Sequence, residues 1–406
     1  MARRDIARLP VTLEYGRGQT LRLDLGDRLR AYADGPRPAA DVRVAVHEAL
    51  ETPDTLPPLE HAVIADDRVA VVLEPAVPGE TEILAEVFGR LDKAGVRPET
   101  VTLLQSAGAD DPRAGLVGDW SRVARVVHDP AEEKACRYLA STSAGERIYL
   151  AKAVVDADAV VVIGQLGFDP LLGFKGSHSG LFPAMSNGEA VRKAVGQGHA
   201  ELSPEDRRPL RETVDEIGWL LGSPYAVQVI PSRGGGVAEV LAGSPEAVQR
   251  AGTRRLAEGW TTELEERAGA VVIGVPDAGT GDGWSRVAAA ADVGRRLVKR
   301  DGRIVLLGDV PEGPGPGLRM LAAAGEPDDV IAPLREAAPP DLTAASRLAG
   351  AAGWARVYLH GHANGDLVED LFMVPVDDPT AVERLLADET DCVVIGSGQF
   401  AWGRVK

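Results

Sequence analysis

The sequence predicts an α/β protein of two domains, each built around a mainly parallel β-sheet. Three observations lead to this prediction: the length of 406 residues, the alternation of apolar strand-length runs with amphipathic helices, and a second such alternation from about residue 263. A single hydrophobic core stops growing at about 250–300 residues, so a longer chain divides into domains. Strands that alternate with helices at short spacing form βαβ units, which join parallel strands.

The predicted N-terminal domain starts with a β-hairpin and a βαβ unit. Residues 11–26, VTLEYGRGQTLRLDLG, alternate apolar and polar side chains around a central turn, which is typical of a hairpin. The apolar run 68–74 predicts a buried strand. Residues 80–95 predict an amphipathic helix, because apolar side chains recur at helical spacing and Gly95 suits the left-handed position after a helix. The run 101–108 is the second strand of this unit.

The remaining elements continue the alternation in both halves of the chain. The N-terminal half adds strands at 125–129 and 159–164, a helix at 203–222 capped by Ser203, and a hairpin at 225–243. The C-terminal half has strands at 270–274, 303–308, 356–361 and 391–396, with a helix at 284–302.

These patterns predict three segments. An N-terminal domain covers 1–262, a C-terminal domain covers 263–390, and a final strand and tail over 391–406 pack back on the first domain. In such folds ligands bind outside the carboxyl ends of the strands, so we expect the two domains to enclose a cleft there.

Composition excludes several classes of partner. The net charge of −17 argues against nucleic acid and anionic membranes, which require clustered lysine and arginine. No apolar run reaches the roughly 18 residues of a membrane helix, and the N-terminus lacks the apolar segment of a secretion signal. Two cysteines, Cys136 and Cys392, cannot form a disulfide framework. We therefore expect a cytoplasmic protein that acts on a small-molecule substrate.

A polar loop follows the most apolar strand of the chain. Residues 173–187, GFKGSHSGLFPAMSN, come shortly after the strand at 159–164 and carry Lys175 and His178 between glycines. This loop either only turns the backbone or holds a small molecule at the carboxyl end of the strand. Residue types alone leave both interpretations open.

Two other segments invite a functional interpretation. Loop 275–283, with Asp309 after the next strand, imitates a dinucleotide fingerprint, but its glycines come too late and too evenly spaced. His360 and His362 would face one side of a continuing strand, but a metal site needs at least one further ligand. A nicotinamide-dependent oxidoreductase therefore remains a minor alternative, and a metal site here is disfavoured.

The ordered series of segments resembles the nickel-dependent lactate racemase family over nearly the whole chain. The similar segments are VTLEYGRGQTLRLDL (11–25), VAVVLEPAVPGETEIL (69–84), the long run from YLASTSAGERIYLAKAV to GLFPAMSN (138–187), and AVVIGVPDAGTGDGWSRVAAAADVGRRLVKRDGRIVLLGDVPEGPG (270–315). No single short motif is decisive, but their order is specific.

The resemblance implies two Rossmann-like α/β domains around a nickel-pincer nucleotide. In the family this cofactor is a pyridinium mononucleotide tethered to a lysine, with nickel held by the cofactor and one histidine. Hydride moves from the substrate carbon to the cofactor and back, while two histidines exchange the hydroxyl proton. The implied activity is that of an isomerase, a racemase or epimerase.

At the matching positions this chain differs from the family. The arginine that binds the substrate carboxylate falls on Val77, and the two acid/base histidines fall on Asp110 and Asp169. The tethering lysine falls on Ser179, and a second carboxylate-binding lysine falls on Ala288. We therefore expect Asp110 and Asp169 to be the catalytic acid/base residues of a divergent member.

Other positions are expected to contact the cofactor. His199 matches the nickel-binding histidine and is the expected metal ligand. The residues expected to bind the rest of the cofactor are Glu74, Lys175, Gly176, His178 and Ser179.

These differences change the expected substrate. Aspartates in place of histidines, and a valine in place of an arginine, would repel a 2-hydroxy acid anion. We expect a racemase or epimerase acting on a neutral or cationic hydroxyl compound, such as a polyol or sugar. The main alternative is a catalytically inactive relative that binds a nucleotide or a partner.

Overall fold

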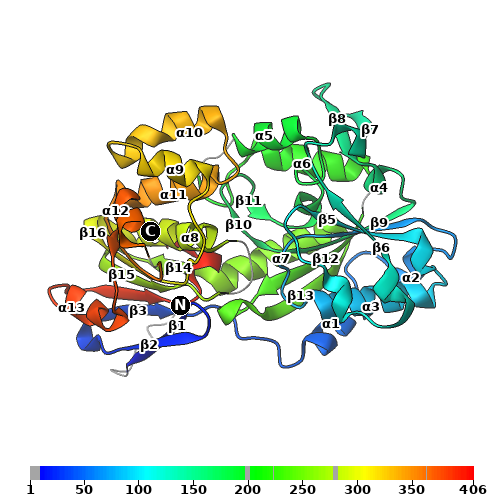
Figure 1. The fold of residues 1–406 in the computed structure, drawn as a ribbon. Coiled ribbons are helices and arrows are strands. Elements are labelled where there is room, and N and C mark those ends of the chain that lie inside the picture. The colour runs from blue at the N-terminus through cyan, green and yellow to red at the C-terminus, as the bar shows by residue number, and fades with distance from the viewer. Residues whose placement is uncertain (1–9, 197–201, 223, 278–281, 363) are drawn as a thin grey trace. The chain divides into compact units, whose positions relative to one another are not determined.

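The computed structural model describes residues 10–196, 202–222, 224–277, 282–362 and 364–406 (Figure 1). The chain divides into two compact units, each with its own six-stranded sheet. Unit 1 comprises Met1–Pro36, Arg233–Gly235 and Ala257–Lys406, and unit 2 comprises Arg37–Ser232 and Gly236–Leu256. The division falls inside helix α7 (Pro245–Trp260).

The sheet of unit 2 has the strand order β13-β12-β9-β4-β5-β6, and only the β12–β13 pair is antiparallel. Its strands are β4 (Val69–Leu73), β5 (Val101–Ser106), β6 (Ala124–His128), β9 (Ala159–Gln165), β12 (Tyr225–Pro231) and β13 (Val237–Gly243). The mainly parallel sheet and the 225–243 hairpin predicted from the sequence are confirmed.

Helices cover both faces of this sheet (Figure 1). In β4, Val71 packs in the same apolar cluster as Val87 of α3, whereas its neighbour Val72 packs in the cluster of Val214 of α6. Successive side chains of a strand point to opposite faces, which is why β4 is apolar throughout. The helices and the small hairpin of this unit are α1 (Val42–Glu51), α2 (Leu59–Ala62), α3 (Glu80–Lys93), α4 (Lys152–Val155), α5 (Gly188–Val195), α6 (Pro209–Leu220), β7 (Cys136–Ser141) and β8 (Arg147–Ala151).

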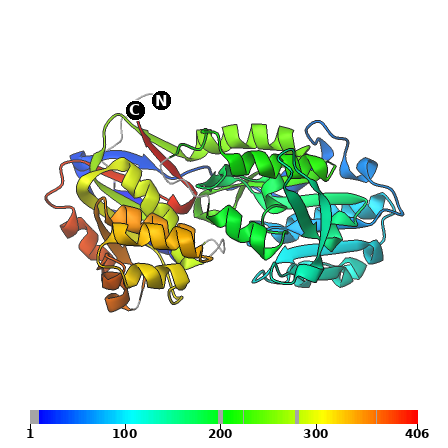
Figure 2. The same ribbon diagram turned by 90° about the horizontal axis from the view of Figure 1, so that it is seen from above.

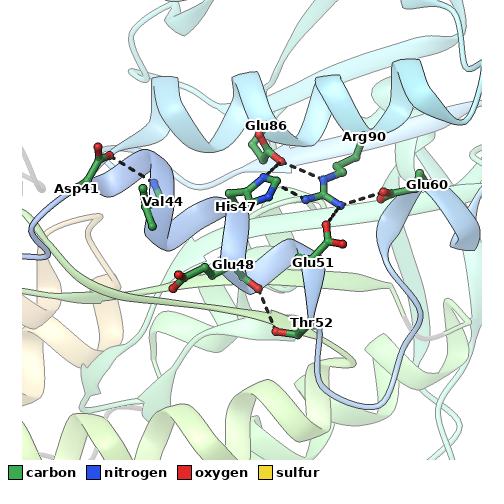
Figure 3. A network of polar contacts seen from close by, with 9 residues as sticks. All are labelled: Asp41, Val44, His47, Glu48, Glu51, Thr52, Glu60, Glu86 and Arg90. Atoms are coloured by element: carbon green, nitrogen blue, oxygen red, sulfur yellow. Dashed lines mark hydrogen bonds and ion pairs between the residues drawn. The ribbon is translucent and has the colours of Figure 1, made fainter.

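A buried arginine ties α1, α2 and α3 together (Figure 3). The Arg90 side chain of α3 is only 1% exposed and donates to Glu51 at 2.8 Å, Glu60 at 2.9 Å and Glu86 at 3.0 Å. His47 lies 3.3 Å from the same guanidinium and 2.9 Å from Glu86. Three carboxylates from three helices therefore bind the planar guanidinium group of one arginine.

The sheet of unit 1 has the order β18-β17-β16-β15-β19-β3, and all its neighbours are parallel. Its strands are β3 (Leu29–Ala33), β15 (Ala268–Gly274), β16 (Val298–Leu307), β17 (Arg356–His360), β18 (Val374–Pro375) and β19 (Cys392–Ile395). A separate parallel pair joins β14 (Thr261–Leu264) to β20 (Trp402–Val405).

The N-terminal hairpin covers one face of the unit 1 sheet. Leu13 of β1 (Val11–Tyr15) and Leu23 of β2 (Gln19–Leu23) share an apolar cluster with Val272 and Val305. Helices α8 (Gly283–Leu297) and α11 (Leu342–Ala352) lie side by side, and α8 packs on β15 and β16 (Figures 1 and 2). The shorter helices of the unit are α9 (Pro316–Ala322), α10 (Ile331–Ala337), α12 (Gly365–Asp370) and α13 (Val382–Leu385).

The observed division differs from the predicted segments 1–262, 263–390 and 391–406 at both ends of the chain. Residues up to Pro36 belong to the C-terminal unit, because β3 pairs with β19 and the hairpin covers that sheet. The final strands also belong to unit 1, since β19 lies between β15 and β3. Local periodicity does not record these long-range strand pairings.

Two predicted helices have different bounds. The helix predicted at 203–222 begins at Pro209, with Arg208 rather than Ser203 at the cap position, because proline suits the first helical turn. The helix predicted at 284–302 ends at Leu297, and the following residues pair with β15 from Val298 onward. None of the described helices combines the length and the apolar composition that spanning a membrane requires.

Candidate active site

A partly buried carboxylate lies at the carboxyl end of the unit 2 sheet. Glu74 directly follows β4, and its Oε2 accepts a hydrogen bond of 3.3 Å from the Gln165 backbone N–H at the end of β9. A Cβ built on Gly164 would lie 2.7–2.9 Å from the carboxylate atoms, and one on Gly180 would lie 3.1 Å from Oε1. The absence of side chains at these two glycines therefore makes the space that holds Glu74.

The Lys175 ammonium group is the positive charge that acts on this carboxylate. Burial raises the pKa of Glu74, whereas the charge of Lys175 and the N–H of Gln165 oppose the rise, and the charge of Asp169 adds to it. The Lys175 stem crosses Gly167, where a built Cβ would lie 2.9 Å from its Cε. No described residue hydrogen-bonds or ion-pairs with the ammonium. Glu74 and Lys175 thus interact electrostatically without a direct salt bridge.

Asp169 belongs to a short ribbon beside this pair. It ends β10 (Gly167–Asp169), which pairs antiparallel with β11 (Gly173–Lys175). Its Oδ1 accepts hydrogen bonds of 2.8 Å from the backbone N–H groups of Leu171 and Leu172. One carboxylate oxygen of this predicted acid/base residue therefore closes the ribbon turn.

Ser179 fixes the backbone of the next turn. Its Oγ accepts a 2.7 Å hydrogen bond from the Gly176 N–H, across a 3-10 turn over Ser177–Gly180. Gly176 has φ 133°, a value that glycine alone adopts readily, and Ser177 has φ 51°. The position that matches the family's tethering lysine therefore carries a hydroxyl group that stabilises the loop.

His178 points toward α6. The residue is 2% exposed, and its Nδ1 lies 3.4 Å from Oδ1 of Asp215, which also pairs with Arg211 one helical turn away. Burial opposes ionisation of Asp215, but hydrogen bonds with His178 and Arg211 outweigh it and hold its pKa below the usual range. The His178 Nε2 is buried and has no hydrogen-bond partner among the residues that the structure describes. This imidazole packs against α6, beside Asp215 and Gly218.

We expect Gly218→Ala to destabilise the protein by about 1–3 kcal/mol, the usual cost of overpacking. A Cβ at Gly218 of α6 would lie 2.2–2.4 Å from ring atoms of His178, and the buried ring has little room to move. Gly89→Ala in α3 is the matched control, since a Cβ there meets nothing within 4 Å. The control should be neutral or stabilising by up to about 1 kcal/mol. Urea unfolding measures both variants, and equal stabilities would contradict this placement of His178.

Four other predicted positions do not join this cluster. Val77 is 4% exposed and lies in the apolar core of unit 2, and Ala288 is fully buried in α8 of unit 1. Asp110 is exposed, and its charge adds to the effect of burial in raising the pKa of Glu80. His199, the predicted metal ligand, lies outside the described residues. Within the described part of the chain, no three metal-binding side chains gather into a site.

The loop that imitates a dinucleotide fingerprint is held by ion pairs where it is described. Asp277 pairs with Arg286 at 3.1 Å and with Arg17 at 3.0 Å, and Asp309 lies 3.5 Å from Arg17. Asp282 caps α8 by accepting a 2.6 Å hydrogen bond from the Ser285 N–H. Residues 278–281 lie outside the described residues. Asp309, the carboxylate that would bind a ribose in a dinucleotide site, thus lies beside Arg17.

The two histidines of the HGH sequence bond to backbone groups. His360 Nδ1 lies 2.7 Å from the Val376 carbonyl oxygen, and His362 Nδ1 accepts a 3.0 Å hydrogen bond from the Asn364 N–H. These contacts use one ring nitrogen of each residue for the local backbone.

Sequence reasoning did not identify the residues that position the loop. Arg211 donates a 3.5 Å contact to the Phe174 carbonyl, and the buried Arg208 donates to the carbonyl of Pro170 at 3.4 Å. The i, i+4 spacing of Arg211 and Asp215 does predict an ion pair on the surface of this helix. Nothing in the sequence indicated that this helix would pack on the loop.

Comparison with known proteins agrees with the resemblance. Residues 15–205 match the lactate racemase N-terminal domain family. The lactate racemase apoprotein from Thermoanaerobacterium thermosaccharolyticum has a similar structure, with a TM-score of 0.80 and 18% identity, over 97% of this chain and 100% of that chain. A Thermotoga maritima protein has a TM-score of 0.66 and 15% identity, over 92% of this chain and 100% of that chain. No curated protein matches the sequence.

The family match and the structural likeness cover different lengths of the chain. The family match covers the residues that form the Glu74–Lys175 site, whereas the structural likeness extends over both units and shows the fold. Residues 15–205 therefore form a lactate racemase N-terminal domain, and the chain as a whole has the lactate racemase fold.

Proposed function

We propose that this protein is a racemase- or epimerase-type isomerase that acts on a hydroxyl-bearing small molecule other than lactate. The family and fold support a racemase-like protein. The observation that carries the proposal is the Glu74–Lys175 pair, a partly buried carboxylate with a raised pKa beside an ammonium without a direct partner among the described residues. Perturbed titratable groups at the carboxyl edge of a parallel sheet are typical of functional sites.

The described residues do not fit the tethered nickel-pincer nucleotide that the family resemblance implies. Ser179 replaces the tethering lysine, and its hydroxyl group already accepts the Gly176 N–H. Val77, in place of the arginine clamp, is packed in the apolar core. We therefore assign the proton chemistry to Glu74 and Lys175 and route no step through the nucleotide.

Glu74 and Lys175 have complementary roles in this proposal. A carboxyl group whose pKa is raised toward neutrality exchanges protons more effectively at physiological pH than an ordinary exposed one. Glu74 removes the proton from the hydroxyl-bearing carbon of a substrate that has a neighbouring carbonyl group. The electron pair of that C–H bond forms an enolate, whose oxygen the Lys175 ammonium stabilises. Return of the proton to the other face of the carbon gives the epimer and regenerates the Glu74 carboxylate. Glu74 directly follows β4, and Lys175 is the last residue of β11, so strands hold the backbone beside both groups.

The same charges argue against lactate as the substrate. Glu74 and Asp169 are two carboxylates within electrostatic range of each other, and each would repel the carboxylate of a 2-hydroxy acid. The chain has no arginine at position 77 to offset this repulsion. A neutral polyol or sugar, or a cationic hydroxyl compound, meets no such penalty.

We expect no interconversion of D- and L-lactate and no covalent nucleotide on the protein. The test uses protein produced with and without the enzymes that make the nickel-pincer nucleotide. Chiral chromatography follows lactate, intact mass detects an adduct, and metal analysis measures nickel. Racemisation of lactate would contradict the substrate assignment, and a nucleotide adduct on Lys175 would contradict its assigned role as a free ammonium.

A catalytically inactive relative that binds a nucleotide or a partner is the second candidate. The hydrogen bond between Ser179 and Gly176 favours it, because the loop keeps an ordered backbone without the lysine. The two candidates differ in one measurement: turnover of a hydroxyl compound that depends on Glu74 supports the isomerase, and binding without turnover supports the inactive relative.

A further inference from the structure

A cavity of about 460 Å³ lies at the edge of the unit 2 sheet, beside the last strand, β13. Its lining residues come mainly from α1, β13 and α7. Helix α1 packs on one face of β13, where Val240 shares an apolar cluster with Val46. Helix α7 packs on the other face, since a Cβ built on Gly252 would lie 3.2 Å from Cδ1 of Leu241. The volume is in the range of small-molecule sites, so the cavity has room for a ligand.

Backbone groups without partners face this cavity. In an antiparallel pair, the backbone groups of alternate residues point away from the partner strand. The carbonyl of Ala242 does so, because it accepts a 2.8 Å hydrogen bond from the Asp54 N–H. Val240, two residues earlier, turns its N–H and C=O to the same edge, where no described residue bonds to them. Val240 is only 6% exposed, and buried backbone groups are nearly always paired, so we expect a molecule in the cavity to bind them.

The chain itself closes both ends of this free edge. The Ala39 N–H donates a 2.8 Å hydrogen bond to the Val237 carbonyl at one end. At the other end, the Ser244 N–H donates a 3.0 Å hydrogen bond to the Asp54 carbonyl. A peptide that added to β13 as a further strand would have to displace these contacts. The free stretch therefore suits a small molecule rather than an extended peptide.

The cavity has more carboxylates than cations. Its charged lining residues are Glu48, Asp54, Glu239 and Arg255. Glu239 pairs with Arg255, whereas the side chains of Glu48 and Asp54 make no hydrogen bond or ion pair with any residue in the described ranges. Figure 3 shows the Glu48 carboxylate pointing away from the Arg90 network. Glu48 and Asp54 are both exposed, so a cation in solution can reach them.

Small apolar side chains make up much of the remaining lining. Alanines come from all three elements: Ala49 of α1, Ala238 of β13 and Ala251 of α7. Their methyl groups leave the space open and offer apolar surface to the carbon chain of a ligand. The cavity therefore suits an aliphatic cation better than an anion.

We infer that this cavity binds a small aliphatic amino alcohol with two ammonium groups. The ammonium groups pair with the Glu48 and Asp54 carboxylates, and the hydroxyl oxygen accepts the Val240 N–H. The hydroxyl hydrogen is then available to the Val240 carbonyl, so one polar group satisfies both backbone atoms. The site shares no residue with the Glu74–Lys175 pair, and the inference does not depend on the function proposed for that pair.

The probe is 1,3-diamino-2-propanol, a small diamine with one hydroxyl group. Calorimetric titration into the full-length protein, at neutral pH and low ionic strength, is expected to show saturable binding. The related 1,3-diaminopropane lacks only the hydroxyl group and should bind about fivefold more weakly, the usual effect of one neutral hydrogen bond. Glycerol has hydroxyl groups in place of both amino groups and should show no saturable binding at the same concentrations.

Two variants test where the probe binds. Glu48→Gln combined with Asp54→Asn removes both free carboxylates and should weaken binding by about tenfold or more, because charge-assisted contacts are lost. Ala251→Leu keeps every charge and suits a helix, but its larger side chain fills part of the cavity, so it should weaken binding to a similar extent. Circular dichroism verifies that both variants keep the fold.

Asp92→Asn combined with Glu99→Gln is the matched control, because both residues are exposed in unit 2 and neither lines the cavity. This control removes the same net charge and should bind the probe like the unmodified protein. Absence of saturable binding, unchanged binding in either cavity variant, or an equal loss in the control would each overturn the inference. Equal affinities for the diamines with and without the hydroxyl group, or saturable binding of glycerol, would overturn the assigned ligand class.

Discussion

Replacing Arg90 by methionine is expected to lower the free energy of unfolding by about 3–5 kcal/mol, the cost of breaking a buried ion pair from one side. The Arg90 side chain is 1% exposed and satisfies Glu51, Glu60 and Glu86 from three helices (Figure 3). Burial opposes ionisation of Glu60, but hydrogen bonds with a backbone group and with Arg90 hold its pKa below the usual range. Without Arg90, partly buried carboxylates would repel one another with no cation between them.

Denaturant unfolding at neutral pH measures this effect, with Glu51→Gln as the control. The Glu51 side chain is 57% exposed, so water replaces its contact with Arg90 and the expected loss is below about 1 kcal/mol. Arg90→Lys keeps the charge but not the fork, and it should fall between the two. If Arg90→Met cost no more than the control, the arginine would not be holding the three helices together.

The succession of strands and helices along the chain, and the mainly parallel character of the sheets, could be predicted from the sequence because both follow from short-range patterns. Residues 69–73 and 159–164 are apolar throughout, as strands buried on both faces must be, and the helix Glu80–Lys93 lies close to its predicted bounds. The placement of the N-terminal hairpin could not be predicted. It depends on pairing between β3 and β19, which are separated by most of the chain.

The candidate site was predictable only in part, for a related reason. Matching positions along the chain identified Asp169 and Ser179, but in the structure both hold the backbone of the loop, which no side-chain pattern reveals. Glu74 and Lys175 were both expected to bind the cofactor. Their electrostatic coupling, and the glycines at 164 and 180 that admit the carboxylate, depend on how the loop folds onto the strand ends.

Glu74→Gln is expected to abolish most of the activity. The same substitution should make the protein more stable at pH values above those at which ordinary carboxyl groups titrate. General acid–base catalysis contributes about 10²–10⁴-fold, so turnover should fall by a factor of this order. Epimer formation from a panel of neutral sugars and polyols, followed by NMR, measures this part. Glutamine keeps an oxygen that can accept the Gln165 N–H, so the local structure should persist.

The stability effect has a defined dependence on pH. Burial raises the pKa of Glu74 above its ordinary value of 4.5, so the folded protein binds this proton more tightly than the unfolded chain does. Stability therefore falls as pH rises from the unfolded pKa through the folded pKa, at up to about 1.4 kcal/mol per pH unit. The Glu74→Gln variant has no carboxyl group at this position, so it does not undergo this fall in stability with rising pH. Its melting temperature should equal that of the unmodified protein near pH 4 and exceed it at pH 8.

Glu80→Gln separates the two effects, since burial, followed by the charge of Asp110, also raises the pKa of Glu80, but no described interaction links it to Lys175. This control should share the pH-dependent gain in melting temperature and keep its activity. If Glu74→Gln were less stable than the unmodified protein at pH 8, the carboxylate would be a stabilising structural anion and not a strained functional one. If it were more stable and equally active, Glu74 would not exchange the substrate proton.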